Sequence, residues 1–337
     1  MRSRTRVPWA MSLVAAALLP GVSGASVPPG LPIPSENYAA LHPWGSSGVV
    51  DIRHMALGNA CVGDDRDTWH ANPAALVSLP GYAVEGHYTV SPFESLPDVN
   101  RYFVGMGGTI GTNQRFKVVG TIAKAKGTMR VGATPLNLEA SEDDVSIEYA
   151  WRVNNRLAVG VGTAYLSTQS KFSATGLGTV TELSSRPKVP GGRIGLTYKL
   201  SANSSIGATY DNYMERVVQR ATALGLADNV NLFHSTAIRV GLALWENENT
   251  TLLIDHEDIA IVGAGTKTAR RGTMVGLERR LGVVALRMGA YEGKLTGGVG
   301  VKTHGWDVGY AFSGKNTLDM PGMGGTTTHA FQVRRSL

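Results

Sequence analysis

The side chains of this chain that could do chemistry are few and lie far apart in the sequence. The densest group is Asp255-His256-Glu257-Asp258, whose residue types are those of a metal site. In an extended strand, adjacent side chains point to opposite faces, so these four would not converge on one ion. The sequence therefore predicts no metal site here and no bound cofactor.

Three histidines, His87, His234 and His256, carry rings that could act as a general base. No serine or acid lies at a diagnostic spacing from any of them, although such triads are defined by geometry and not by sequence order. The Gly-rich pieces at 105–108 and 298–301 do not open helices after strands, so they make poor phosphate loops. We expect loop or rim histidines, and a protein that is not an enzyme.

From Tyr82 to the end of the chain, bulky apolar residues alternate with small, polar or charged ones at a period of two. This pattern predicts that β-strands position these residues. In the stretch 193–200, for example, bulky apolar residues alternate with Arg193, Gly195, Thr197 and Lys199. Such alternation suits the half-buried sheet of a soluble sandwich. It equally suits a membrane barrel whose bulky face meets lipid and whose small or polar face meets the lumen.

The lengths of the connections separate these two folds. Connections after even-numbered strands are tight, as at 154–155, whereas most of those after odd-numbered strands are long, as at 125–143, 167–190 and 212–234; the turn near Gly293 is the exception. We expect the last of these long connections to be a partly apolar outer loop that could be helical. An up-and-down barrel with both termini in the periplasm predicts this pattern, and a Greek-key sandwich does not. The fold class expected is an all-β, transmembrane antiparallel barrel of about fourteen strands, at 82–90, 101–110, 115–124, 144–153, 156–166, 191–200, 204–211, 235–245, 250–258, 272–280, 283–291, 295–303, 305–313 and 328–336.

The amino-acid composition excludes further classes of protein. The 337 residues are 43% hydrophobic and only 17% charged, with 42 glycines, and after the first residues no eighteen consecutive residues are apolar. This excludes a helical membrane protein. Lysines and arginines are scattered singly without interleaved aromatics, so no nucleic-acid partner is expected. Cys61 is the only cysteine, which leaves no internal disulfide and a packing role for that residue.

The first residues have the pattern of a secretion signal. Arg2, Arg4 and Arg6 precede an apolar stretch at 8–19 and small residues at 23–25, which predicts cleavage before Ser26. Loss of these three arginines would lower the net charge from +6 to about +3. We expect a signal peptide at 1–25, an N-terminal arm and plug segment at 26–80, and a barrel at 81–337, exported to the bacterial outer membrane.

The most distinctive stretch, 55–76, lies directly before the first expected strand. It resembles the N-terminal signature of the long-chain fatty-acid transporter (FadL) superfamily of outer-membrane barrels, including its PorV/PorQ-like branch. The matching positions are Gly58, Ala60, Asp64, Asp65, Asn72, Pro73 and Ala74. The resemblance implies a fourteen-stranded barrel with this stretch as a hatch inside it, and a lateral opening near a kinked strand. A local interpretation also exists, in which Asn72 caps a helix that begins at Pro73.

The chain departs from the family pattern in being shorter than a typical fatty-acid transporter and in ending at Leu337 instead of an aromatic residue. Arg193, Arg239 and Arg287 fall on the expected lumen face, where they could bind a carboxylate head group. They could equally pair with lumen acids such as Asp307.

Two functions follow from this resemblance. The first is transport of hydrophobic, fatty-acid-like small molecules across the outer membrane through a plugged barrel, in contact with membrane lipid. The alternative is a PorV/PorQ-like accessory of a protein-secretion or surface-attachment system, whose partner would be a secreted or secretion-system protein.

Overall fold

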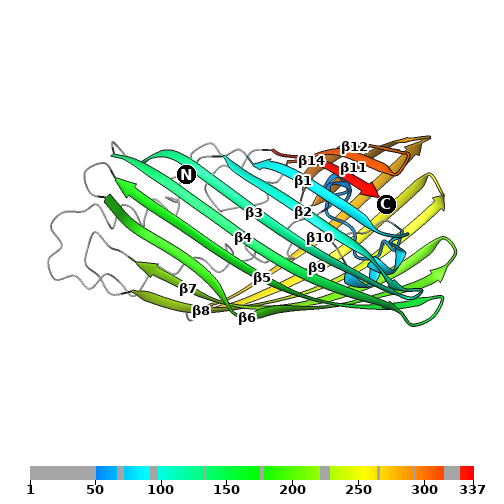
Figure 1. Ribbon diagram of the computed structural model, residues 1–337, viewed down its shortest axis with the longest axis horizontal. Coiled ribbons are helices and arrows are strands. Elements are labelled where there is room, and N and C mark those ends of the chain that lie inside the picture. Colours follow the sequence, from blue (N-terminus) through cyan, green and yellow to red (C-terminus); the bar gives the residue numbers. More distant parts are fainter. Residues whose placement is uncertain are drawn as a thin grey trace, which may run out of the picture.

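The chain folds as a closed barrel in which each strand pairs antiparallel with its neighbours in the sequence and the first strand pairs with the last (Figure 1). This computed structural model describes residues 51–66, 72–91, 98–131, 134–174, 178–220, 228–263, 266–291, 293–314 and 327–337. The expected signal peptide and residues 26–50 of the expected arm lie outside the described residues. The predicted fold class and the fourteen strands are confirmed.

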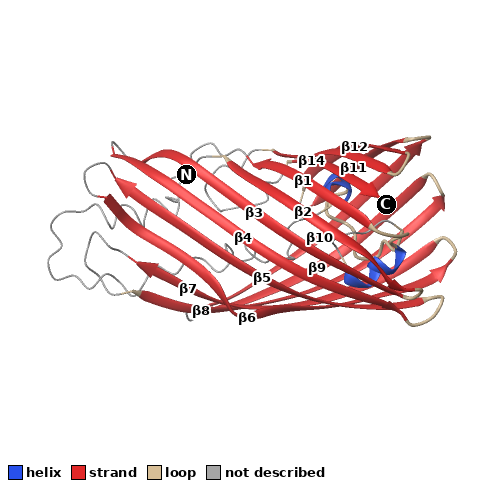
Figure 2. Cartoon of the chain, in the orientation of Figure 1, coloured by secondary structure: helices blue, strands red, loops and turns tan. Residues whose placement is uncertain are grey.

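The described residues before the barrel contain two short helices, α2 (Ile52–Ala56) and the 3-10 helix η3 (Pro73–Ser78) (Figure 2). The strands are β1 (Ala83–Ser91), β2 (Val99–Gly111), β3 (Gln114–Val131), β4 (Thr134–Arg152), β5 (Leu157–Ala174), β6 (Gly178–Ser201), β7 (Ser204–Arg220), β8 (Asn229–Asn247), β9 (Thr250–Gly263), β10 (Thr266–Leu281), β11 (Val284–Tyr291), β12 (Lys294–Thr303), β13 (Trp306–Ser313) and β14 (Thr328–Ser336).

The two faces of the barrel wall have the polarity of a membrane barrel and not of a soluble protein. Large apolar side chains point outward, and Val104 and Met288 are more than half exposed. Charged side chains such as Glu148, Arg193 and Glu278 point inward and are buried. An apolar exterior of this extent is unfavourable in water and favourable in lipid. Within the described ranges, no helix has the length and apolar character that a membrane crossing needs.

The strand ends were predicted correctly at the tight turns and wrongly at the opposite end of the barrel. There the expected loops at 125–143, 167–190 and 212–234 are mostly strand, since β3 to β8 continue through them. The stretch 212–234 is therefore not a helical loop: its ends belong to β7 and β8, and 221–227 lie outside the described residues.

Opposite charges stand in register in the extensions of β3 to β7. Each residue of one outward-facing row pairs with the next across five strands, and the row alternates in charge: Lys126, Glu139, Lys171, Glu182 and Arg220. Opposite charges directly across a strand pair are favourable. We call these five residues the outer charge ladder.

Candidate functional site

The described residues before the barrel, 51–66 and 72–80, lie inside it at the end that carries the tight turns (Figure 1). We call them the N-terminal segment. Its helix α2 packs against β11 to β14, and η3 packs against β3 to β6. Leu57 and Ala60 pack with barrel residues Trp245, Met274 and Tyr291 in one buried cluster. The segment therefore contacts most of the circumference of the barrel.

Asn72 makes both local and long-range contacts. Its side-chain oxygen accepts a hydrogen bond from the N–H of Ala74 (3.0 Å), so it caps η3, and Pro73 is the first residue of that helix. Its side-chain nitrogen donates to the carbonyl oxygens of Val62 (3.0 Å) and of Leu196 in β6 (2.9 Å). Asn72 thus starts the helix and also fixes it to the barrel wall.

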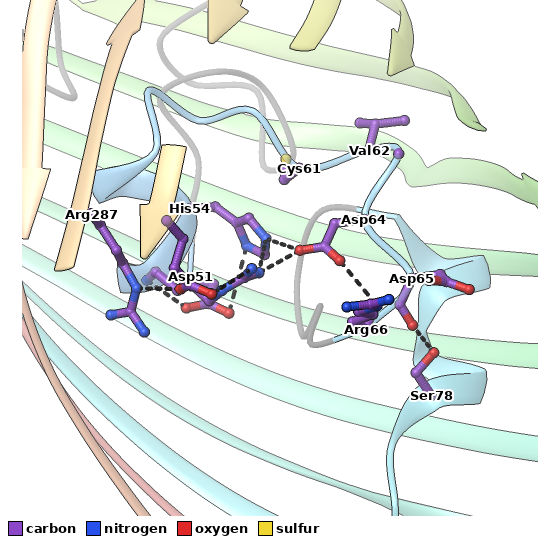
Figure 3. Close-up of polar contacts among 12 residues, drawn as sticks. Asp51, His54, Cys61, Val62, Asp64, Asp65, Arg66, Ser78 and Arg287 are labelled. Carbon is purple, nitrogen blue, oxygen red and sulfur yellow. Dashed lines mark hydrogen bonds and ion pairs between the residues drawn. The ribbon is translucent and has the colours of Figure 1, made fainter. Parts of the chain in front are cut away.

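A buried ion-pair cluster fixes the other half of the N-terminal segment. Arg53 donates from Nε and Nη2 to the two oxygens of Glu278 in β10 (2.9 and 3.2 Å), and from Nη1 to Asp64. Arg287, which is labelled in Figure 3, also donates to Glu278 at 2.7 Å, and Arg280 donates to it at 3.0 Å. Glu278 thus receives three guanidinium groups, of which only the one of Arg53 comes from the segment.

The charge of Asp64 is maintained by this cluster. Burial alone would raise the pKa of Asp64, but the Arg53 guanidinium and a hydrogen bond from His54 lower that pKa far below its usual value. The N–H of Arg66 also donates to Asp64 (3.0 Å). Asp64 therefore stays ionised, and it holds both ends of the stretch 53–66 together.

Asp255 binds the middle of the N-terminal segment. One of its carboxylate oxygens accepts hydrogen bonds from the backbone N–H groups of Cys61 (2.7 Å) and Val62 (2.8 Å). The Cys61 side chain is buried, and burial, followed by the nearby Asp255 charge, raises the pKa of its thiol. The thiol is consequently protonated and unreactive at neutral pH.

Glycines on the lumen face allow the N-terminal segment to approach the strands closely. A Cβ atom built on Gly207 would overlap the carbonyl oxygen of Val62, and one on Gly160 would overlap the backbone of Pro73 and Ala74. Similar overlaps with the segment would occur at Gly195, Gly276 and Gly289. The small face of the sequence alternation is thus the surface that the segment occupies.

Basic side chains at the tight-turn end bind the last part of the N-terminal segment. Arg152 donates to the carbonyl oxygen of Val77 (3.0 Å), and Arg115 donates to that of Leu79 (3.0 Å). Lys199 forms an ion pair with Asp65 at 3.1 Å. Carbonyls at the C-terminal end of η3 therefore have cationic partners.

All seven residues of the expected hatch signature lie in the N-terminal segment. Besides the contacts above, the N–H of Gly58 donates to Thr296 of β12 (2.9 Å), and its φ of 69° is one that favours glycine. Sequence reasoning missed Arg53 and Glu278, and it considered Asp255 only as a metal ligand. An acid on the small face of a strand was the available signal, because that face meets the lumen.

The three arginines expected to bind a ligand head group all lie on the lumen face, and each one binds a carboxylate of the barrel. Arg193 donates to Asp211 (2.6 and 3.0 Å), Arg239 donates to Glu257 (3.0 Å from Nε), and Arg287 donates to Glu278. Asp307, named as a possible partner, pairs instead with Arg334. This geometry favours pairing within the wall, and ligand binding by these arginines stays a prediction.

The remaining candidate residues do not converge. Asp255 and Glu257 point into the lumen and are buried, while the side chain of His256 is exposed on the outer face. His87 stacks on Phe103 and contacts Glu85 in the lumen, whereas His234 contacts Asn212 (2.9 Å) on the outside. The described part of the chain contains no cluster of three or more residues suited to a metal ion.

Comparison with solved structures supports the expected fold. The toluene transporter TodX of Pseudomonas putida superposes with a TM-score of 0.60 at 12% identity, over 86% of this chain and 99% of that one. The monoaromatic hydrocarbon channel CymD superposes with a TM-score of 0.57 at 13% identity, over 86% of this chain and 97% of that one. A FadL homologue from Pseudomonas aeruginosa superposes with a TM-score of 0.52 at 10% identity, over 85% of this chain and 97% of that one. No family model and no curated protein matches the sequence. The chain thus has the FadL-type barrel fold that its N-terminal signature predicted.

Proposed function

We propose that this chain transports hydrophobic small molecules across the bacterial outer membrane, through a barrel that the N-terminal segment closes at its periplasmic end. The outward apolar face supports the membrane location. The buried contacts of Arg53, Asn72 and Asp255 support closure, since they hold the segment across the lumen. The fold shared with TodX and CymD supports transport of an apolar solute.

An apolar cluster on the lumen face carries the proposal. Toward the long-connection end, β7, β8 and β9 turn a set of buried apolar side chains inward: Val217, Phe233, Ala237, Ile259 and Ile261. The lumen of a membrane barrel is ordinarily polar, and a wall of this kind would favour an apolar solute over water. This cluster would form the entry half of the route, and the N-terminal segment would control the exit half.

Uncharged hydrocarbons fit this route better than fatty acids. A fatty acid brings a carboxylate that needs a cationic partner, and Arg193, Arg239 and Arg287 already bind carboxylates of the wall. A carboxylate that displaced one of them would leave a buried acid without its cation, which is costly. We therefore place neutral aromatic or aliphatic hydrocarbons first among the substrates.

The test measures uptake of labelled toluene and labelled laurate by cells with and without the gene. Toluene uptake should fall when the gene is removed, and Ile261→Asn should reduce it because the substitution adds a polar group to the lumen cluster. Val262→Asn is the matched control, since Val262 points outward. Equal uptake with and without the gene would end the transport proposal.

One observation favours the alternative, a PorV/PorQ-like accessory of protein secretion. The inner half of the lumen is lined by buried ion pairs, such as Lys117 with Glu148 at 2.8 Å, through which an apolar solute would pass poorly. A protein that only displays its outer surface would tolerate such a lumen. Pull-down from detergent-solubilised membranes would then recover large secretion subunits, and toluene uptake would not depend on the gene.

A further inference from the structure

The barrel wall is interrupted between β5 and β6. Their pairing is regular up to Ala164 with Gly191 and resumes at Thr168 with Ser185. Between these pairs β5 has three residues, 165–167, and β6 has five, 186–190, so β6 bulges out of register. Pro187 and Pro190 lie in the bulge and have no N–H to donate to a neighbouring strand. The register of β6 with β7 shifts at the same place.

A pocket of about 450 Å³ lies beside this bulge, between β4 and β7. Its lining includes Asp143, Gln169, Glu182, Ser184, Arg216 and Arg220. The pocket opens to the outside of the barrel and not to the lumen, because Val218 lines it while the adjacent Val217 belongs to the buried lumen cluster. No part of the proposed transport route uses it.

The pocket carries groups that recognise phosphate and sugar. Gln169 donates to Glu182 (2.6 Å), and Arg220 forms an ion pair with Asp228 (3.0 Å). Arg216 has no ion-pair partner among the described residues, so its guanidinium remains available for a phosphate. Hydroxyl, amide and carboxylate groups around it match the hydroxyl groups of a sugar.

The position of the pocket along the barrel axis indicates that its ligand is a lipid. On β4 and β5, the next outward residues toward the tight turns are the exposed apolar residues Val145 and Tyr165, which stand opposite each other. On the opposite side lies the outer charge ladder, which includes the pocket residues Glu182 and Arg220. The pocket thus lies where the outer surface changes from apolar to charged, the level of lipid head groups in a membrane.

We propose that this pocket binds the phosphorylated sugar head group of a glycolipid in the outer leaflet, with Arg216 on the phosphate and an acyl chain along Val145 and Tyr165. The apolar strip directly below the pocket is the reason for choosing a lipid over free phosphate. The proposal rests on the outer-membrane location and is independent of the transported solute.

The experiment measures binding of purified lipopolysaccharide to the delipidated full-length protein in detergent, by native mass spectrometry. The wild-type protein should bind it, and Arg216→Ala should weaken binding by about tenfold or more, the value of one charge-assisted contact. Arg271→Ala is the matched control, because Arg271 is an exposed arginine on β10 that lies outside the pocket and pairs with Asp258. Heat-modified mobility on a gel verifies that each variant is folded.

Three results would overturn the proposal. One is that Arg216→Ala binds lipopolysaccharide as strongly as the wild-type protein or as the control Arg271→Ala. Another is full competition by inorganic phosphate alone, which would indicate a site for the free anion. The third is equally strong binding of phosphatidylglycerol vesicles, which would indicate that the sugar is not recognised.

Discussion

Two groups of ion pairs in this barrel, one around the N-terminal segment in the lumen and one along the outer charge ladder, differ mainly in their access to water. The side chains of Arg53 and Glu278 are 5% and 1% exposed, whereas those of Lys126 and Glu139 are 80% and 59% exposed. Both are short contacts between opposite charges. Loss of one partner in the lumen leaves a charge without water or counter-ion, whereas loss of one in the ladder leaves a hydrated charge.

The comparison teaches that the two regions use charge for different purposes. In the lumen, charge fixes where the N-terminal segment lies, because each buried carboxylate must keep its partners. On the outside, charge sets which residues of neighbouring strands stand opposite each other, and water screens most of the interaction energy. Substitutions in the two regions should therefore differ greatly in cost.

The largest effect is expected from Glu278→Ala. The substitution leaves Arg53, Arg280 and Arg287 without their shared carboxylate, and breaking a buried pair typically costs about 3–5 kcal/mol. The free energy of unfolding in detergent, from guanidinium titration, measures this cost. Glu139→Ala removes the same charge from the ladder and serves as the control; similar losses in both variants would contradict the comparison.

A smaller effect is expected from Gly207→Ala, which places a methyl group against the Val62 carbonyl oxygen. Overpacking of this kind costs about 1–3 kcal/mol and should displace the stretch around Cys61. Labelling of Cys61 by a maleimide reports the displacement, since this thiol is buried and is the only one in the chain. Gly120→Ala, where the added atom meets open space, should leave Cys61 as slow to react as in the wild-type protein.

Acid should loosen the N-terminal segment in a way that depends on Asp64. The pKa of Asp64 is lowered in the folded protein, so its contribution to stability is complete above its unfolded pKa of about 4 and is lost as the pH falls below that value. Unfolding free energies measured from about pH 6 to about pH 3 should decline in the wild-type protein. The Asp64→Asn variant should have a lower free energy of unfolding than the wild-type protein at about pH 6, and this free energy should decline less as the pH falls. Identical pH profiles of the two proteins would refute this role of Asp64.

The smallest effect is expected from Lys126→Ala in the outer charge ladder. Its partner Glu139 stays hydrated after the substitution, so the unfolding midpoint should not change within error. The reversed pair, Lys126→Glu with Glu139→Lys, should behave in the same way. A shift as large as that of Glu278→Ala would show that the ladder stabilises the barrel as strongly as the lumen contacts do.

The sequence predicted the parts of the fold that depend on local pattern. Alternation of bulky and small residues identified every strand, and the tight turns located one end of each hairpin. The far ends of β3 to β8 were placed wrongly. In β3 to β7 the outward residues there include the polar residues of the outer charge ladder, which pair by charge with the neighbouring strand. Pairs such as Glu139 with Lys171 become visible only when the register is known.

The candidate site was predicted only in part for a related reason. The signature at 58–74 identified a segment by resemblance, and the capping role of Asn72 followed from local rules. The partners of that segment, Asp255 and Glu278, lie about 200 residues further along the chain, in β9 and β10. Nothing in their immediate sequence indicates which backbone or guanidinium groups they bind.

Ion conductance in a planar lipid bilayer tests most directly whether buried polar contacts hold the N-terminal segment across the lumen. Asp255→Ala removes the acceptor of the Cys61 and Val62 N–H groups, and His256→Ala changes the adjacent outward residue as a control. The account predicts little conductance for the wild-type protein and for His256→Ala, and a clear rise for Asp255→Ala. A wild-type barrel that conducts as freely as Asp255→Ala would contradict it.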